Sequence, residues 1–186
     1  MTQKHYHFPT GGLPAQDQLI SGRSVFKTAY AFIPGGVLSD IVTSQLPFWT
    51  KARFWILARP MTGFAETFSQ YIAELDAGGG SDKPESNPLA QGAIFVVDGE
   101  LLLTIEGQEH VLKTGDFAYI PPASNWTIWN KASNPVRFHW IRKKYQVVEG
   151  LEKPEFILGH DHQIDANAMP NTDGKWATTR FIDPED

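Results

Sequence analysis

Two His-x-His pairs are the part of this sequence whose residue type and spacing point most directly to metal chemistry. His5 and His7 lie near the start of the chain, and His160 and His162 lie near its end. On a β-strand, residues i and i+2 project from the same face, which would let each pair of imidazoles chelate a transition metal. Neither pair has a carboxylate at the spacing that metal-binding β-barrels use, and both lie in segments predicted as loop or tail. We therefore expect solvated histidines at both places, without a metal.

Two further histidines, His110 and His139, lie in predicted strands. Because buried polar side chains are mostly hydrogen-bonded, we expect both imidazoles to be satisfied by hydrogen bonds and to take no part in catalysis. No catalytic residue is assigned in this sequence.

A recognisable motif lies between Gly115 and Asn130, where the chain reads GDFAYIPPASNWTIWN. It resembles the second motif of the cupins, G-x5-P-x-G-x2-H-x3-N, with Pro121 and both end residues in place. Ala123 stands where the motif has glycine, and Trp126 stands where it has a metal-binding histidine. The residues that shape the cupin strands are present, while the metal ligand is replaced by an indole.

The first cupin motif, G-x5-H-x-H-x3,4-E-x6-G, aligns with residues 79–99 in the same incomplete way. Its two histidine positions fall on Glu85 and Asn87. Its glutamate position falls on Gly92, next to Gln91. The glycines at both ends match, and the imidazoles are absent from this motif as well.

These replacements predict a barrel that holds no metal. A cupin metal is held by about three imidazoles and a carboxylate that converge inside the barrel, whereas the indole of Trp126 offers only an N–H donor and ring bulk. One interpretation is that Trp126 is a packing residue that fills the space of the metal. The other is that it forms the aromatic wall of a pocket for a small polar ligand, with Glu85, Asn87 and Gln91 as hydrogen-bond partners.

The elements that must position these residues are short β-strands. Runs rich in Val, Ile, Phe and Trp alternate with Gly and Pro, and helical periodicity is weak throughout. At least eight strands are expected, over residues 25–33, 38–43, 53–58, 67–75, 93–97, 100–105, 117–120, 126–130 and 136–147, with another that includes Leu112.

Two dipeptides predict tight hairpins. Asp98-Gly99 is typical of a type I′ turn, in which both residues need a positive φ, and would join residues 93–97 to 100–105. Glu106-Gly107 predicts a second hairpin, with one apolar face made by Leu101, Leu103 and Ile105. Residues 162–168 are the longest candidate for a helical turn.

The fold class predicted from this pattern is all-β: an antiparallel jelly-roll (cupin) barrel with an irregular C-terminal linker. We expect an N-terminal tail over residues 1–20 and a degenerate cupin barrel over residues 21–150. Residues 151–186 are expected to form a linker and the start of a missing second cupin, because polar, Pro- and Gly-rich sequence precedes a strand-like run at residues 176–182.

Composition limits the class of protein. The 186 residues are 41% hydrophobic and 20% charged, which is enough apolar material for one core. A net charge of −5 argues against nucleic-acid binding, which depends largely on release of phosphate counterions. No apolar stretch approaches the roughly 20 residues that span a bilayer, and cysteine is absent. We expect a cytoplasmic protein that binds neither nucleic acid nor membrane.

Several longer stretches carry a more specific resemblance. They are residues 30–40, 66–80, 95–100, 119–122 and 144–150. With these stretches the chain resembles, from about residue 10 onward, the N-terminal half of the two-cupin (S)-ureidoglycine aminohydrolases, also described as glyoxylate-induced proteins.

The resemblance implies a function for the complete enzyme. That family releases ammonia hydrolytically from (S)-ureidoglycine to give ureidoglycolate, in purine and allantoin degradation, with a manganese ion held by the second cupin. Its N-terminal cupin is degenerate and serves packing and assembly. The resemblance therefore implies no cofactor in this chain, no metal ligand among its residues, and no activity of the chain alone. Expected partners are a second copy or a second cupin domain, and the small-molecule substrate binds only the full enzyme.

Two alternatives remain open. The chain would be a stand-alone, metal-free cupin that serves as a small-molecule binding or assembly module if no second barrel follows in the gene. A conventional metal cupin, such as a dioxygenase or sugar isomerase, is disfavoured because the ligand set is missing from both motifs. The coding sequence downstream of Asp186 separates the first alternative from the enzyme.

Overall fold

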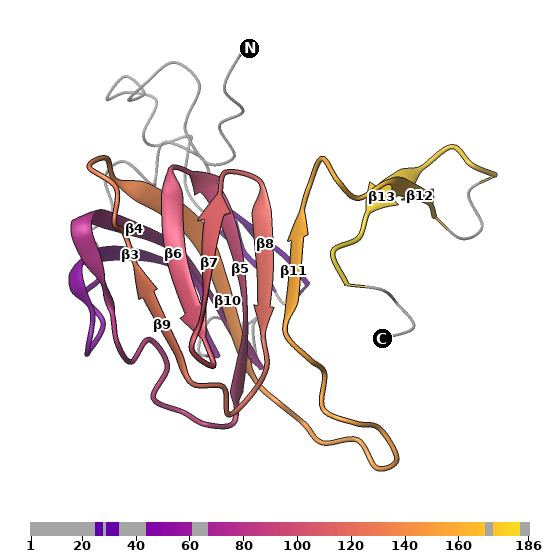
Figure 1. The fold of residues 1–186 in the computed structure, drawn as a ribbon. Coiled ribbons are helices and arrows are strands. Elements are labelled where there is room, and N and C mark those ends of the chain that lie inside the picture. The colour runs from indigo at the N-terminus through magenta and orange to yellow at the C-terminus, as the bar shows by residue number, and fades with distance from the viewer. Residues whose placement is uncertain (1–24, 28, 34–43, 61–66, 170–172, 183–186) are drawn as a thin grey trace.

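The computed structural model describes residues 25–27, 29–33, 44–60, 67–169 and 173–182, and the regular structure in these ranges is β (Figure 1). None of the described residues form a helix long and apolar enough to cross a membrane. The strands are β1 (Val25–Phe26), β2 (Ala31–Phe32), β3 (Thr50–Ala58), β4 (Phe68–Ser81), β5 (Ala90–Asp98), β6 (Glu100–Ile105), β7 (Gln108–Lys113), β8 (Asp116–Ile120), β9 (Trp126–Trp129), β10 (Val136–Lys144), β11 (Ile157–His160), β12 (Ala166–Ala168) and β13 (Ala177–Thr179).

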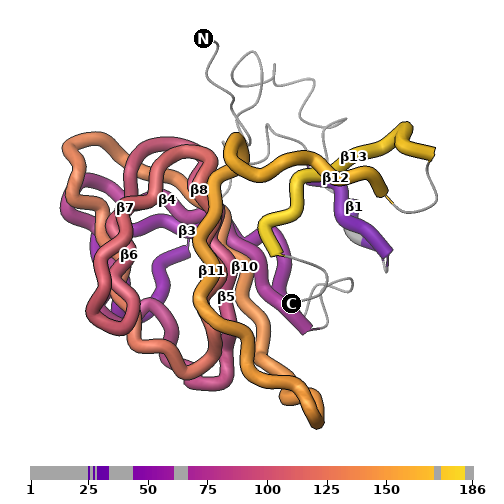
Figure 2. The backbone as a smooth tube through the Cα atoms, turned by 45° about the vertical axis from the view of Figure 1, so that its right-hand side comes forward, coloured from indigo at the N-terminus to yellow at the C-terminus, as the bar shows by residue number. Residues whose placement is uncertain are grey.

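One nine-stranded antiparallel sheet dominates the structure. Its order is β11-β8-β5-β10-β4-β9-β6-β7, and β3 pairs with β4 beside this path. The sheet curls into a half-barrel, so that β7 at one end returns to contact β5 and β8 (Figure 2). The 14-residue strand β4 makes this possible, because Phe68 to Leu75 pair with β10 while Gly80 and Ser81 pair with β9. This arrangement confirms the predicted all-β, antiparallel cupin architecture.

The core lies inside the curl and follows from strand alternation. Side chains one residue apart project to opposite faces, so a period of two separates an inner from an outer face. On β6 the inward residues Leu101, Leu103 and Ile105 are at most 4% exposed, as the sequence predicts. The inward residues Ile94 of β5 and Phe138 of β10 are fully buried against them.

The two predicted hairpins have different outcomes. Glu106 and Gly107 both have positive φ, 48° and 81°, and they join β6 to β7 as expected for a type I′ turn. The hairpin predicted at Asp98-Gly99 is wrong. Both edges of β5 are already paired, with β10 and β8, so β6 cannot add to it and pairs with β7 and β9. At Asp98-Gly99 the chain turns from β5, which lies between β8 and β10, into β6, which lies between β9 and β7.

The other strand predictions are confirmed within a few residues, with local differences. Residues 25–33 form two short paired strands, β1 and β2, instead of one. The helical turn predicted over residues 162–168 is wrong: this segment makes hydrogen-bonded turns and then β12. Residues 1–20, 38–43 and the pair His5 and His7 lie outside the described residues.

The C-terminal segment contains more regular β-structure than the irregular linker that the sequence predicts. Ile157–His160 add to the sheet as β11, in register with β8. β12 and β13 then form a separate hairpin away from the curl (Figure 1). The chain returns to the barrel at Phe181, whose ring stacks on Phe117 at 4.8 Å and meets Phe95 edge-on at 5.8 Å. These contacts fix the segment against the outer face of the sheet.

Gly80 of β4 pairs with Trp129 of β9, and its substitution tests the shape of the curl. A Cβ on Gly80 would lie 2.2 Å from the Ile128 carbonyl oxygen, at φ +153°, whereas a Cβ on Gly107, at φ +81°, would meet nothing within 4 Å. We expect Gly80→Ala to lower the free energy of unfolding by roughly 3 kcal/mol or more, from backbone strain and overpacking together. Urea unfolding measures it.

Gly107→Ala is the matched control, because it shares the positive φ but not the close contact. Gly107→Ala should lower the free energy of unfolding by about 1–2 kcal/mol, which is the cost of backbone strain alone. Equal losses for the two variants would contradict the close approach of β4 and β9.

The two strand histidines lie in different surroundings. On the outer face, His139 of β10 lies in register between Ile72 of β4 and Phe95 of β5, and burial lowers the pKa of His139 below its usual 6.5. On the inner face, the ring of His110 lies 5.0 Å from that of Phe156, and its buried Nε2 has no hydrogen-bond partner among the described residues. Among the described residues, Nε2 of His110 therefore lacks the hydrogen bond that the sequence predicts, and the imidazole packs against an aromatic ring.

His139 should make stability depend on pH in a defined direction. Because its pKa is lower in the folded state, the unfolded chain takes up the proton first as the pH falls below about 6.5. The free energy of unfolding should therefore decline from pH 7.5 to 5.5, and His139→Gln should make this decline shallower. Urea midpoints at the two pH values measure it. An unaltered slope in the His139 variant would refute the assignment.

Candidate functional site

Aromatic rings occupy the barrel interior where the two cupin motifs would place metal ligands. The indole of Trp140, on β10, is the centre of this group. Its ring centroid lies 5.5 Å from those of Trp49 and Tyr71, 6.2 Å from that of Trp126 and 6.4 Å from that of Phe54. All except Trp49 belong to the buried core, and Trp49 packs against it. Offset and edge-on pairs at these distances are favourable, so the cluster is a packed core.

The indole of Trp140 lies close to Gly92, at a position where the first motif would place a metal ligand. This residue stands at the glutamate position of the first motif. A Cβ added to Gly92 would lie 3.1 Å from Nε1 of Trp140. This contact is tight, so a first-motif glutamate at this position would press against the Trp140 ring unless the indole shifted.

An ion pair occupies the first of the two histidine positions of that motif. Glu85 accepts two hydrogen bonds from Arg142 of β10, at 2.5 Å from Nε and 2.7 Å from Nη2. The guanidinium lies 5.9 Å from the Trp140 ring centroid and so covers one side of the aromatic cluster. Burial lowers the pKa of Arg142, but the hydrogen bond and charge of Glu85, and to a lesser degree Tyr71, raise it overall. Glu85 is therefore engaged by a permanent cation.

The four residues predicted to line one pocket are not brought together. Trp126 is 8% exposed and belongs to the inner core. Asn87 is exposed and shapes the turn before β5, where its Oδ1 accepts a hydrogen bond from the Leu89 N–H at 3.0 Å. Glu85 lies next to Asn87, accepting the Asn87 N–H at 2.9 Å. Gln91 projects to the opposite, outer face of β5, because Gly92 beside it faces inward.

The donor set inside the barrel does not fit a transition metal. Indoles, a phenol and a guanidinium offer ring faces and hydrogen-bond donors, and a metal requires imidazole, thiolate or carboxylate lone pairs. Within the described ranges, no group of three or more His, Asp or Glu side chains is placed to hold a metal ion. At the second His-x-His pair, Nδ1 of His160 accepts the His162 backbone N–H at 3.1 Å, and Asp161 Oδ1 lies 3.1 Å from that same nitrogen.

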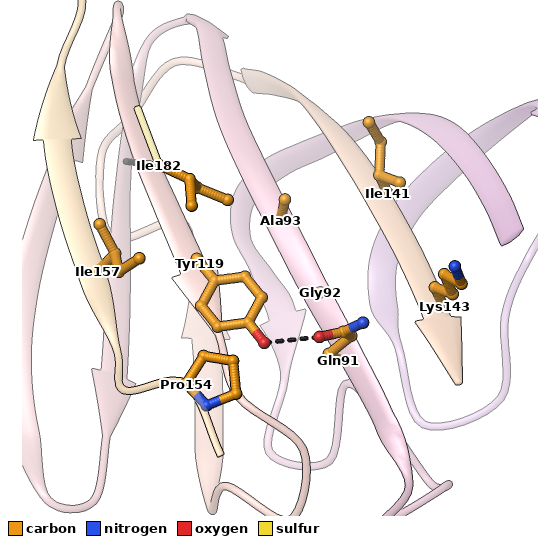
Figure 3. A pocket seen from close by; sticks show the side chains of 9 residues that line it. All are labelled: Gln91, Gly92, Ala93, Tyr119, Ile141, Lys143, Pro154, Ile157 and Ile182. Carbon is orange, nitrogen blue, oxygen red and sulfur yellow. Dashed lines mark hydrogen bonds between the residues drawn. The ribbon is translucent and has the colours of Figure 1, made fainter. Parts of the chain in front are cut away.

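A pocket lies on the outer face of the same strands, between the sheet and the C-terminal segment (Figure 3). Its volume is ≈ 370 Å³, within the range of small-molecule sites. It is lined by Gln91, Gly92, Ala93, Tyr119, Ile141, Lys143, Pro154, Ile157 and Ile182.

Two polar side chains of this pocket are joined to each other. The Tyr119 hydroxyl donates to Oε1 of Gln91 at 2.6 Å. Burial, and secondarily Tyr145, raise the pKa of Tyr119, so this phenol stays protonated. Sequence reasoning placed Gln91 with Glu85 and Asn87 and missed Tyr119 altogether. The available signal was the period of two, which assigns Gln91 and Ala93 to one face and Gly92 to the other.

Comparison with known proteins agrees with this geometry. Residues 71–142 match the model of the cupin domain family. The structure superposes on that of a glyoxylate-induced protein from Pseudomonas aeruginosa with a TM-score of 0.84 and 50% identity, covering 98% of this chain and 66% of that one. The (S)-ureidoglycine aminohydrolase of Escherichia coli (strain K12) is 23% identical over 152 residues, or 81% of this chain and 56% of the relative. The Escherichia coli protein Ylba shares the fold, with a TM-score of 0.71 at 21% identity.

The curled antiparallel sheet and the matching domain define a protein of the cupin fold. This chain is distantly related to (S)-ureidoglycine aminohydrolase and is a close structural match to the glyoxylate-induced protein. The chain spans 56% of the length of the first relative and 66% of the second.

The Glu85–Arg142 pair can be tested for its contribution to stability. Glu85→Ala leaves a cation without its carboxylate above Trp140, and should lower the free energy of unfolding by about 1–2 kcal/mol, since Arg142 keeps 30% side-chain exposure. The double variant Glu85→Ala with Arg142→Met should lose less than the sum of the single losses. Urea unfolding of the full cycle gives the coupling energy, with Glu109→Ala, at an exposed carboxylate, as the control. Strict additivity would show that the pair contributes nothing.

Proposed function

We propose that this chain is the structural, metal-free cupin portion of an (S)-ureidoglycine aminohydrolase-like protein. In this proposal the chain corresponds to the N-terminal cupin, and the complete protein releases ammonia hydrolytically from ureidoglycine to give ureidoglycolate. The manganese ion and the reacting groups belong to a second cupin. The role of this chain is packing and assembly, with the second cupin domain or a second copy as its partner, in the cytoplasm.

The filled barrel interior is the observation that carries this proposal. Trp140 and Trp126 occupy the space in which cupin ligands converge, and Glu85, at a histidine position, is held by Arg142. Among the residues that the structure describes, a barrel interior filled by these rings has no set of ligands for metal-assisted hydrolysis. A scaffold role accounts for both features.

The relatives support the choice of reaction. The curated relative is an aminohydrolase acting on (S)-ureidoglycine, and the structural match at 50% identity is a glyoxylate-induced protein. Both are longer than this chain, which leaves room for a second barrel in each.

The proposal is tested by measuring ammonia. The purified 186-residue chain, supplied with Mn²⁺ and freshly prepared ureidoglycine, should release ammonia at the spontaneous rate. The E. coli aminohydrolase assayed in parallel is the positive control. Elemental analysis of the dialysed chain should find manganese well below one ion per chain. Stoichiometric metal, or ammonia release at the rate of the control enzyme, would refute a metal-free structural role.

A stand-alone binding module is the second candidate, and the outer pocket is the observation that favours it. This candidate needs no second barrel, because the pocket is built wholly from residues of this chain. A reading frame that closes directly after Asp186 would favour the module, and one that continues into a second barrel with His and Glu ligands would favour the enzyme portion.

A further inference from the structure

The outer pocket is a built feature of the sheet. Ile157, Tyr119, Ala93 and Ile141 are register partners in one row across β11, β8, β5 and β10. Because they occupy equivalent positions on adjacent strands, their side chains project from the same face and make a continuous apolar floor and walls (Figure 3). The pocket therefore rests on regular backbone pairing.

The C-terminal segment closes the pocket from above. Phe181 stacks on Phe117, and this contact places the next residue, Ile182, over the row. At the other end, Lys153 Nζ donates to the Pro122 carbonyl at 3.2 Å and so anchors the neighbouring wall residue Pro154. Ile182 and Pro154 are therefore both held in place by contacts outside the pocket.

The polar groups of the pocket favour an anion. Lys143 and Gln91 are direct cross-strand partners, and both line the pocket. Since Oε1 of Gln91 already accepts from Tyr119, its amide nitrogen remains as a donor, and Figure 3 shows that nitrogen on the side away from the phenol. An ammonium and an amide N–H at one end of an apolar pocket match a carboxylate.

We propose that this pocket binds small amphipathic monocarboxylates, with an apolar body between Ile141, Ile157 and Ile182 and a carboxylate at Lys143 and Gln91. Small molecules with polar groups along their whole length, such as ureidoglycine, would leave those groups unpaired against the apolar walls. The site is separate from the barrel interior and does not depend on the proposed function.

Calorimetric titration of the purified chain with a matched ligand series tests the head group. Octanoate should bind at least about fivefold more tightly than octanol or octylamine, the ratio expected for one partly exposed charge pair. Acetate, which lacks the apolar body, should not bind measurably. Equal affinity for octanoate and octylamine, or binding of acetate, would overturn the proposal.

Variants locate the site. Lys143→Met should weaken octanoate binding about fivefold and remove the preference over octanol, while Lys113→Met, at an exposed lysine on β7, should leave binding unchanged. Ala93→Phe fills the floor and should abolish binding. Equal effects of the two lysine variants would overturn the assignment, even if Ala93→Phe proves unstable. Absence of octanoate binding, together with a dimer in sedimentation that Ala93→Phe dissociates, would show that a second copy occupies the pocket and would equally overturn it.

Discussion

Trp140 imposes the constraint on which the rest of the structure depends. Its indole is packed by four other aromatic rings within 6.4 Å and covered on one side by a guanidinium. Protein interiors are close-packed, so a barrel of fixed size holds either these rings or a solvated ligand set. Three features of the described inner face accompany these rings: a glycine at position 92, Glu85 paired with Arg142, and no group of three or more His, Asp or Glu side chains placed to hold a metal ion.

The same strands present a different surface to the outside. Because successive residues alternate between faces, β5 supplies Ile94 to the core and Gln91 and Ala93 to the outer pocket. Filling the interior therefore places no restriction on the outer face. The inner residues can therefore maintain the fold without constraining which side chains the outer face carries.

Features set by local sequence were predictable, and features set by pairing across the sheet were not. The inward set on β6 and the Glu106-Gly107 turn follow from alternation and turn preference, and both were found. Asp98-Gly99 has the stronger turn signal, yet both edges of β5 are paired elsewhere. Glu85 and Arg142 are 57 residues apart, so no motif spacing connects them. Gln91 was assigned to the wrong neighbours because one residue of offset reverses the face of a strand.

The length of strand β4 has a consequence for how the protein unfolds. It is hydrogen-bonded to β3 and β10 along its first half and to β9 at its end, so a single continuous backbone belongs to both halves of the curl. Neither half can lose its order while the other keeps all of its backbone pairing. Local opening should therefore be confined to peripheral strands such as β12 and β13, and amides of β4 should exchange with solvent only when the whole barrel melts.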